Sequence, residues 1–289
     1  MPDNAENAAA LAAARAGVKI VELHELDEIH DACALLDRVW RPDAGNPLMT
    51  PELLRVLGHS GGYVAGAYED GRLAAVSLGL LATAGLHSHI TAVDGAARGR
   101  NVGHALKLHQ RAWALGRGIT TVTWTFDPLV SRNAYFNLAK LGAVPAEYLA
   151  NFYGVMRDGV NAGTDSDRLL VRWDLAAPRI RASDPVSPPA GAVAGLEHGP
   201  GGRPVAGPLD AEVVLVRVPS DIEALRRADP GAAQEWRVAV REVLGGLMAE
   251  GRHVTGFTRD GRYVLRSPAD ILLEPGRPPA TPRHERGTT

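Results

Sequence analysis

The stretch from residue 87 to residue 116 constrains the fold of this chain more than any other part of the sequence. An apolar, β-prone run from His87 to Val93 is followed by a loop of small and basic residues, and helical periodicity runs from Val102 to about Leu115. The next segment, Ile119–Phe126, is rich in β-branched residues and predicts a buried strand. A strand, a helix and a second strand in this order form a βαβ unit.

The segments on either side of this unit predict hairpin strands and further helices. The turn Glu69-Asp70-Gly71 joins two apolar, β-prone runs. The predicted elements are, in chain order, a strand over 18–23, helices from Asp27 and from Thr50-Pro51, strands over 62–68 and 73–81, and, after the unit, a helix over 133–141 and strands over 152–155 and 169–173. Hairpins followed by crossovers predict the α/β class, with a mixed sheet and helices on both faces.

Composition predicts how this domain is bounded. Residues 177–209 are dense in Pro, Gly and Ala, which is typical of a linker. We expect residues 1–17 to be a frayed or disordered tail, 18–176 the main domain, 210–268 a small α/β extension and 269–289 a disordered tail. The extension is predicted to hold a strand over 213–218, helices opened by Asp221 and over 232–248, and paired strands over 252–257 and 262–266.

Charge and composition argue against several partners. The net charge of −2 gives no reason to expect nucleic acid or an anionic membrane as a partner. No segment has the apolar length of a bilayer span, and the N-terminus lacks the pattern of a secretory signal. One cysteine, Cys33, suits a reducing cytoplasm. No group of His or carboxylate residues has metal-ligand spacing, so no metal is expected.

The loop before the helix from Val102 has the features of a diphosphate site. The first N–H groups of a helix have no internal partner and lie at the positive end of its dipole. Gly99 and Gly103 allow phosphate to approach the backbone, while Arg98 and Arg100 add positive charge.

These residues resemble the acetyl-CoA motif of the GNAT N-acetyltransferase superfamily. Val93, Arg98, Val102 and Gly103 match the motif, whereas Asn101 stands in the place of its first glycine. Asparagine tolerates a left-handed backbone, so the loop conformation is expected to persist. The resemblance implies the GNAT fold and an acyl-CoA donor, acetyl-CoA or one with a bulkier acyl group.

A second stretch carries the same resemblance. Ala134 and the ending Lys140-Leu141-Gly142 match the family's later helix, and the stretch is similar to a bacterial branch of the family. Two residues depart from the pattern: Ser131 stands in the usual asparagine place, and Leu138 in the place of the tyrosine that protonates the departing thiolate. The resemblance implies a cofactor site formed by Thr91, Ala92, Val93, Arg98, Gly99, Arg100, Asn101, Val102, Gly103, His104, Asn133 and Phe136.

Acyl transfer to an amine needs a base and a proton donor. The two-residue strand period places His87, His89 and Thr91 on one face, with His87 as candidate base and His89 toward the acceptor. Tyr135 and Tyr153 are the candidate acids. Asp127 either binds the acceptor amine or only caps a helix.

Two functions of different class remain open. One is an active N-acyltransferase acting on a small-molecule amine, and the other is a non-catalytic acyl-CoA-binding sensor. Leu138 and Asn101 favour the sensor, while the Arg98–Gly103 turn and the strand histidines favour the enzyme. The extension is expected to cover the acceptor cleft, extend the sheet or form a homodimer contact.

Overall fold

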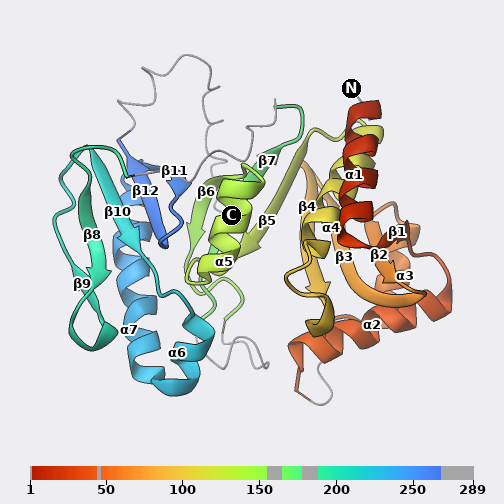
Figure 1. Ribbon diagram of the computed structural model, residues 1–289, viewed down its shortest axis with the longest axis horizontal. Helices are drawn as coiled ribbons and strands as arrows, with labels where there is room; N and C mark the ends of the chain where they lie inside the picture. Colours follow the sequence, from red (N-terminus) through yellow and green to blue (C-terminus); the bar gives the residue numbers. More distant parts are fainter. Residues whose placement is uncertain (1, 44–46, 155–164, 178–187, 268–289) are drawn as a thin grey trace, which may run out of the picture.

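The computed structural model describes residues 2–43, 47–154, 165–177 and 188–267. In this part of the chain, two sheets lie side by side (Figure 1). The first sheet has the order β1-β2-β3-β4-β5-β7-β6, and its neighbours are antiparallel except for the parallel pair β4–β5. Its strands are β1 Lys19–Glu22, β2 Tyr63–Glu69, β3 Arg72–Ala82, β4 Gly85–Val93, β5 Thr121–Phe126, β6 Val144–Leu149 and β7 Arg168–Asp174. The predicted mixed α/β sheet is confirmed.

Helices cover both faces of the first sheet. On one face lie α2 Leu26–Trp40 and α3 Pro51–His59, packed through a cluster that includes Leu36, Leu54 and Leu78. On the other lie α1 Pro2–Ala16, α4 Val102–Gly116 and α5 Ser131–Ala134, which continues as the π-helical turn η2 Tyr135–Lys140. Thr50 caps α3 as predicted, its side chain accepting a hydrogen bond from Leu53 N at 3.3 Å. Glu25, two residues before Asp27, caps α2.

The tail expected over residues 1–17 is instead the packed helix α1. Its small side chains Ala9, Ala13 and Ala16 lie against the α4 side of the sheet. Alanine has the highest helix propensity and lets two helices approach closely, so an alanine-rich segment forms a stable helix once a partner is present. These alanine side chains are enough for a helix–helix contact.

The second sheet begins inside the segment expected to be a linker. Its order is β11-β12-β10-β8-β9, with β8 and β10 parallel. Its strands are β8 Val193–His198, β9 Pro204–Ala206, β10 Val213–Arg217, β11 His253–Phe257 and β12 Arg262–Arg266. Its helices are α6 Ile222–Ala228, α7 Pro230–Val240, the π-helical turn η4 Arg241–Gly245 and α8 Gly246–Ala249. Since β8 and β9 pair with the extension, the linker prediction is wrong for residues 193–206; part of it, 178–187, and the tail over 269–289 lie outside the described residues.

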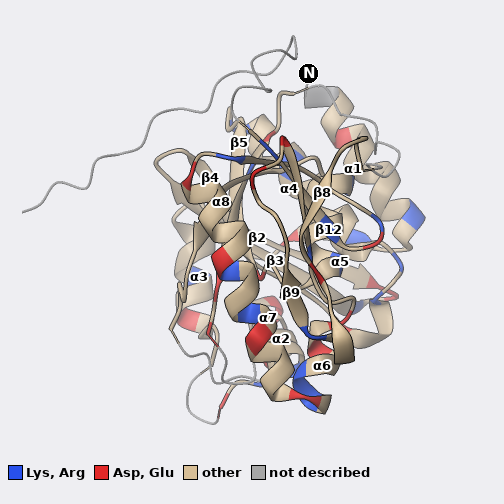
Figure 2. Cartoon of the chain, turned by 90° about the vertical axis from the view of Figure 1, so that its left-hand side faces the viewer, with Lys and Arg blue, Asp and Glu red and all other residues tan. Residues whose placement is uncertain are grey.

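One hydrophobic core runs through both sheets. A single cluster joins Trp124 and Phe126 of β5 to Trp236 of α7 and to Phe257 and Tyr263 of the second sheet. Helices α6 and α7 carry both acidic and basic side chains (Figure 2). The strand predicted over 152–155 is replaced by β6, which ends before residue 150; Val155 itself lies outside the described residues. None of the described helices has the length and apolar character needed to cross a membrane.

Candidate functional site

The N-terminus of α4 begins without a side-chain cap. Asn101, the residue before the helix, adopts the left-handed conformation predicted for it, with φ 63° and ψ 18°, and its side chain makes no capping hydrogen bond. The first backbone bond of the helix runs from Ala105 N to Asn101 O at 3.0 Å. The N–H groups of Val102, Gly103 and His104 therefore precede the helical hydrogen-bond ladder. They lie where an anion is best stabilised by the helix.

The two arginines of this loop differ in what they are free to bind. Arg100 forms a bidentate ion pair with Glu69, with 2.6 Å between Nη2 and Oε2. Arg98 is exposed and, within the described part of the chain, has no ion pair. Of the two predicted phosphate contacts, Arg98 is thus available to an incoming anion, and Arg100 already has a carboxylate partner.

Strands β4 and β5 pair at one end and then separate. Pairing is limited to Leu86 with Val122 and His87 with Thr123, although β4 continues to Val93. Gly85 allows the two strands to approach closely where β4 begins, because its φ is 130° and a Cβ there would lie 2.3 Å from the carbonyl oxygen of Thr121. Beyond the paired residues, no described strand pairs with the β5-facing edge of β4, whose backbone groups can take another hydrogen-bonding partner.

A β-bulge interrupts β4 at His89. Leu78 of β3 pairs with Ile90 and the next residue, Gly79, pairs with Ser88, so His89 is the extra residue. A bulge shifts the side-chain alternation by one residue. Ser88 and Val93 accordingly both face α4, although they lie an odd number of positions apart in the sequence.

The prediction that His87, His89 and Thr91 share one face of the strand is therefore wrong for Thr91. Its hydroxyl lies 2.9 Å from that of Ser77, on the α4 side of the sheet. His87 lies on the opposite side, with its ring 6.3 Å from that of His89. The two-residue period would hold only in a strand without the bulge.

His87 is held at the point where the strands separate. Its Nδ1 lies 3.1 Å from Oγ1 of Thr123. Burial, followed by the nearby His89 and Lys107, lowers the pKa of His87 below its ordinary value of 6.5. The imidazole is consequently neutral near pH 7, the form that accepts a proton.

Tyr153 lies on the same side of the sheet as His87. Its hydroxyl is 3.3 Å from Oγ1 of Thr125, which alternates with the core-facing Trp124 along β5. The side chain is 41% exposed and stacks edge-on against Phe152. The structure thus brings His87, His89 and Tyr153 to one face through the threonines of β5.

The later helix lies on the opposite side, next to α4. Phe136 meets His104 edge to face at 6.3 Å between ring centres, so these two predicted cofactor residues lie together. Tyr135 packs against the core, and Asn133 is exposed. Leu138 is 9% exposed and is part of the same core. Tyr135 and Tyr153 therefore occupy opposite sides of the sheet.

A buried lysine, which the motif comparison did not single out, lies beneath the separating strands. Lys107 of α4 is 5% exposed, and its Nζ lies 2.7 Å from Ser88 Oγ, 3.1 Å from Gln110 Oε1 and 4.0 Å from the centre of the Trp124 ring. Burial lowers its pKa from 10.5 to about 7. Gln110 Nε2 is buried and has no hydrogen-bond partner among the described residues. Its neighbours one helical turn away, His104, Gln110 and Arg111, are polar, so helical periodicity alone predicts a solvent-facing lysine at this position.

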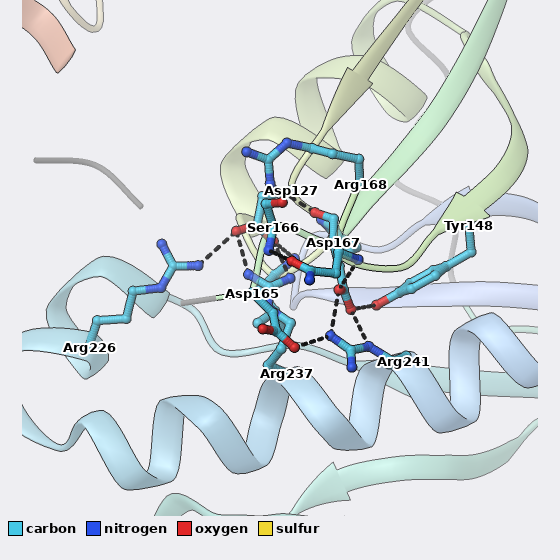
Figure 3. Close-up of polar contacts among 12 residues, drawn as sticks. Asp127, Tyr148, Asp165, Ser166, Asp167, Arg168, Arg226, Arg237 and Arg241 are labelled. Atoms are coloured by element: carbon cyan, nitrogen blue, oxygen red, sulfur yellow. Dashed lines mark hydrogen bonds and ion pairs between the residues drawn. The ribbon is translucent and has the colours of Figure 1, made fainter. Parts of the chain in front are cut away.

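Asp127, expected to bind an amine or cap a helix, is occupied by the second half of the chain. It accepts hydrogen bonds from Arg237 (2.8 and 2.7 Å) and from Arg226 (2.7 Å), all of them buried (Figure 3). It also accepts from Leu129 N at 2.9 Å, which accounts for the capping part of the prediction. The acceptor role for Asp127 is overturned because its carboxylate already has two cationic partners.

A neighbouring cluster of polar side chains adds to this contact between the first sheet and the second half of the chain. Asp167 accepts from Arg241 (2.9 and 2.7 Å) and from the hydroxyl of Tyr148 (2.7 Å), and Arg241 also reaches Asp165 (Figure 3). Aspartates from the first sheet and its loops thereby meet arginines from α6 and from the helix that runs through α7 into η4. These contacts hold the second half of the chain against the ends of β5 and β7.

A cavity lies away from this site. It has a volume of about 400 Å³ and is lined by α1, β1 and the C-terminal half of α4, including Glu22, His109 and Trp113. No group of three or more metal-ligating side chains occurs among the described residues.

Comparisons with known proteins found one matching family model and several similar solved structures. Residues 4–135 match the family model described as an acetyltransferase (GNAT) domain. No curated protein matches the chain. Similar solved structures include the ribosomal-protein-S18-alanine N-acetyltransferase from Escherichia coli (17% identity, 56% of this chain and 97% of that chain covered, TM-score 0.43). Another is an N-acetyltransferase from Staphylococcus aureus (17% identity, 55% of this chain and 98% of that chain covered, TM-score 0.44). A third is a proposed acetyltransferase from Salmonella typhimurium with its cofactor acetyl-CoA (13% identity, 57% of this chain and 99% of that chain covered, TM-score 0.46).

The family match spans the elements that make up the site. It covers α1, the strands β1 to β5, the loop before α4 and the start of the later helix. It contains Arg98, Asn101 and the separating strands. On this evidence, residues 4–135, somewhat less than half of the chain, are similar to GNAT acetyltransferase domains.

Proposed function

We propose that this protein is an N-acyltransferase that moves an acetyl or other acyl group from acyl-CoA directly to the amine of a small molecule. The observation that carries the proposal is the edge of β4 that no described strand pairs with beyond His87, on the strand that leads into the uncapped N-terminus of α4. An extended donor with a diphosphate at one end and amide groups along its length suits such an edge.

The loop and helix fit the diphosphate. A Cβ at Gly99 would meet no atom within 4 Å, and one at Gly103 would meet only Val93, at 3.7 Å, so the surface above these residues is open. The N–H groups of Val102 to His104 and the guanidinium of Arg98 would hold the phosphates. Backbone N–H groups at the His89 bulge would polarise the thioester carbonyl.

His87 would remove the proton from the acceptor amine. For Nε2 to accept that proton, Nδ1 must carry the other hydrogen and donate it to Thr123, whose hydroxyl oxygen accepts it at 3.1 Å. The lowered pKa of His87 keeps the ring neutral for this role. The amine nitrogen then attacks the carbonyl, the C–N bond forms and the C–S bond breaks.

A non-catalytic acyl-CoA sensor is the competing function, and Leu138 in the usual tyrosine place favours it. Calorimetry with acetyl-CoA and longer acyl-CoA donors tests binding, and release of free thiol in the presence of an amine panel tests transfer. Binding with amine-dependent thiol release supports the enzyme. Binding with no turnover on any amine supports the sensor, and no heat of association rejects both.

Replacing Arg98 by glutamate is expected to weaken acyl-CoA binding by about tenfold or more, because a hydrogen bond to a charged group contributes about 1.5–3 kcal/mol. Calorimetry measures the change. Arg15→Glu, at an exposed arginine on α1, is the matched control and should leave the Kd unchanged. Equal affinity of both variants and the unmodified protein would place the diphosphate elsewhere.

A further inference from the structure

Lys107 lies at the position where β4 and β5 separate. The last paired residues are His87 and Thr123, and the next residues along the two strands, Ser88 and Trp124, are both in contact with its ammonium group. The nitrogen therefore lies at the closed end of the gap between the strands. It approaches from the α4 side, opposite to the side occupied by His87.

The choice of lysine at this position is unusual for this chain. Of 31 basic residues, only Lys19, Lys107 and Lys140 are lysines, and all the others are arginines. Arginine cannot lose its proton in a protein, whereas a buried lysine can. In the described part of the chain no carboxylate pairs with Lys107, so its charge is not fixed by an ion pair.

Among the described residues, neither candidate tyrosine is shown in a position to protonate the departing thiolate from the α4 side. Leu138 fills the place of the usual tyrosine and is buried in the core. Tyr153 lies on the acceptor side of the sheet, hydrogen-bonded to Thr125. Tyr135 packs against the core at the start of η2.

We propose that Lys107 is the proton donor to the thiolate of CoA as it leaves, an assignment that rests on the proposed N-acyltransferase function. The acceptor nitrogen forms its bond to the carbonyl carbon and gives its proton to His87. The C–S bond breaks, and its electron pair stays on sulfur, which takes a proton from the Lys107 ammonium. Lys107 is left as a neutral amine held by Ser88 and Gln110, and exchange with solvent returns both side chains to their starting forms.

The surroundings of Lys107 suit a group that gains and loses a proton. Burial brings its pKa to about 7, so the ammonium form is acidic enough to protonate a thiolate. From α4 it faces the uncharged Gln110, from β5 the indole of Trp124, and from β4 Ser88 and the titratable His87, which it influences electrostatically. The unpartnered Nε2 of Gln110 supplies a further donor at the same place.

Lys107→Met tests the assignment, with Lys140→Met, at an exposed lysine, as the matched control. With acetyl-CoA and a reactive amine, kcat of Lys107→Met should fall about 100-fold or more, while the acetyl-CoA Kd stays within about threefold. With an S-aryl thioacetate, whose thiol is far more acidic, the deficit should shrink to less than about tenfold, because a good leaving group needs no proton donor. The fall in wild-type kcat as pH rises through about 7 should disappear in the variant.

The outcomes separate this assignment from the function on which it rests. If Lys107→Met keeps the wild-type kcat, the proposed role of Lys107 is overturned. The same holds if its kcat falls equally with acetyl-CoA and with the S-aryl thioacetate. Neither result contradicts the proposed N-acyltransferase function. An acylated Ser88 trapped during turnover also overturns the role of Lys107, since Lys107 would then serve a nucleophilic serine. If the wild-type protein binds no acyl-CoA, or binds it without turnover, both proposals fall. Thermal unfolding of each variant shows that loss of activity is not loss of fold.

Discussion

Asp127→Ala is expected to lower the free energy of unfolding by about 3–5 kcal/mol, because it leaves two buried arginines without their anion. Arg226 and Arg237 are 8% and 2% exposed, and both guanidinium groups are directed at this carboxylate. Asp127 joins the end of β5 to α6 and α7, so the contact between the two halves of the chain should weaken first. Chemical denaturation measured by far-UV circular dichroism gives the change.

Two further variants separate charge from local turn geometry. Asp127→Asn keeps an oxygen for Leu129 N but removes the charge, so a loss close to that of alanine assigns the effect to the arginines. Asp210→Ala, at an exposed aspartate, is the matched control and should change stability by less than about 0.5 kcal/mol. A loss below about 1 kcal/mol in Asp127→Ala would contradict a buried ion-paired contact.

The same group predicts how stability depends on pH. The arginines hold the pKa of Asp127 well below its usual range, despite the opposing effect of burial. A carboxyl whose pKa is lower in the folded state stabilises the protein fully above its unfolded pKa, about 3.9, and loses that contribution as pH falls. The free energy of unfolding should therefore drop below about pH 4 in the wild type and drop less in Asp127→Asn.

The sequence predicted the part of the fold that depends on local pattern. The βαβ unit and the hairpin at Asp70-Gly71 follow from residue type and spacing within a few positions, and the left-handed conformation of Asn101 was expected from its place in the motif that the loop resembles. The position of His87 beside His89 followed from the same reasoning.

Features that depend on distant residues were not predictable in this way. The bulge at His89 is set by how β3 and β4 pair, and it moved Thr91 to the other face. Asp127 looked free because Arg226 and Arg237 lie 99 and 110 residues away in sequence. The strands β8 and β9 were not predicted, because the Gly and Pro content of their segment is typical of a linker. They are stabilised by pairing with β10 and with each other.

Lys107 illustrates a signal that was present but had no motif. Its neighbours one helical turn away, His104 and Arg111, are polar, so in an isolated helix it would be assigned to the solvent face. Its burial depends on the separation of β4 and β5, which the strand sequences do not encode individually. The rarity of lysine in this chain was the one sequence feature that marked the position.

His87→Gln is expected to lower kcat for amine acylation by about 10²–10⁴-fold, the usual contribution of general-base catalysis. Glutamine retains a hydrogen-bonding group toward Thr123 but cannot accept the amine proton at neutral pH. The acyl-CoA Kd should stay unchanged, because His87 lies on the side of the sheet away from α4. Steady-state kinetics with the best amine of the panel, combined with calorimetry, measures both quantities.

The pH profile distinguishes a base from a residue that only shapes the site. Burial lowers the pKa of His87, so the neutral, active form prevails above a value that lies below 6.5, and wild-type kcat should rise as pH increases through that value. His87→Gln should lose this acid limb, whereas His253→Gln, at an exposed histidine of β11, should keep both the limb and the rate. A His87→Gln variant that retains wild-type kcat and the same acid limb would mean that the amine proton leaves by another route, and His89, whose ring lies 6.3 Å away on the same face, would then be the residue to replace next.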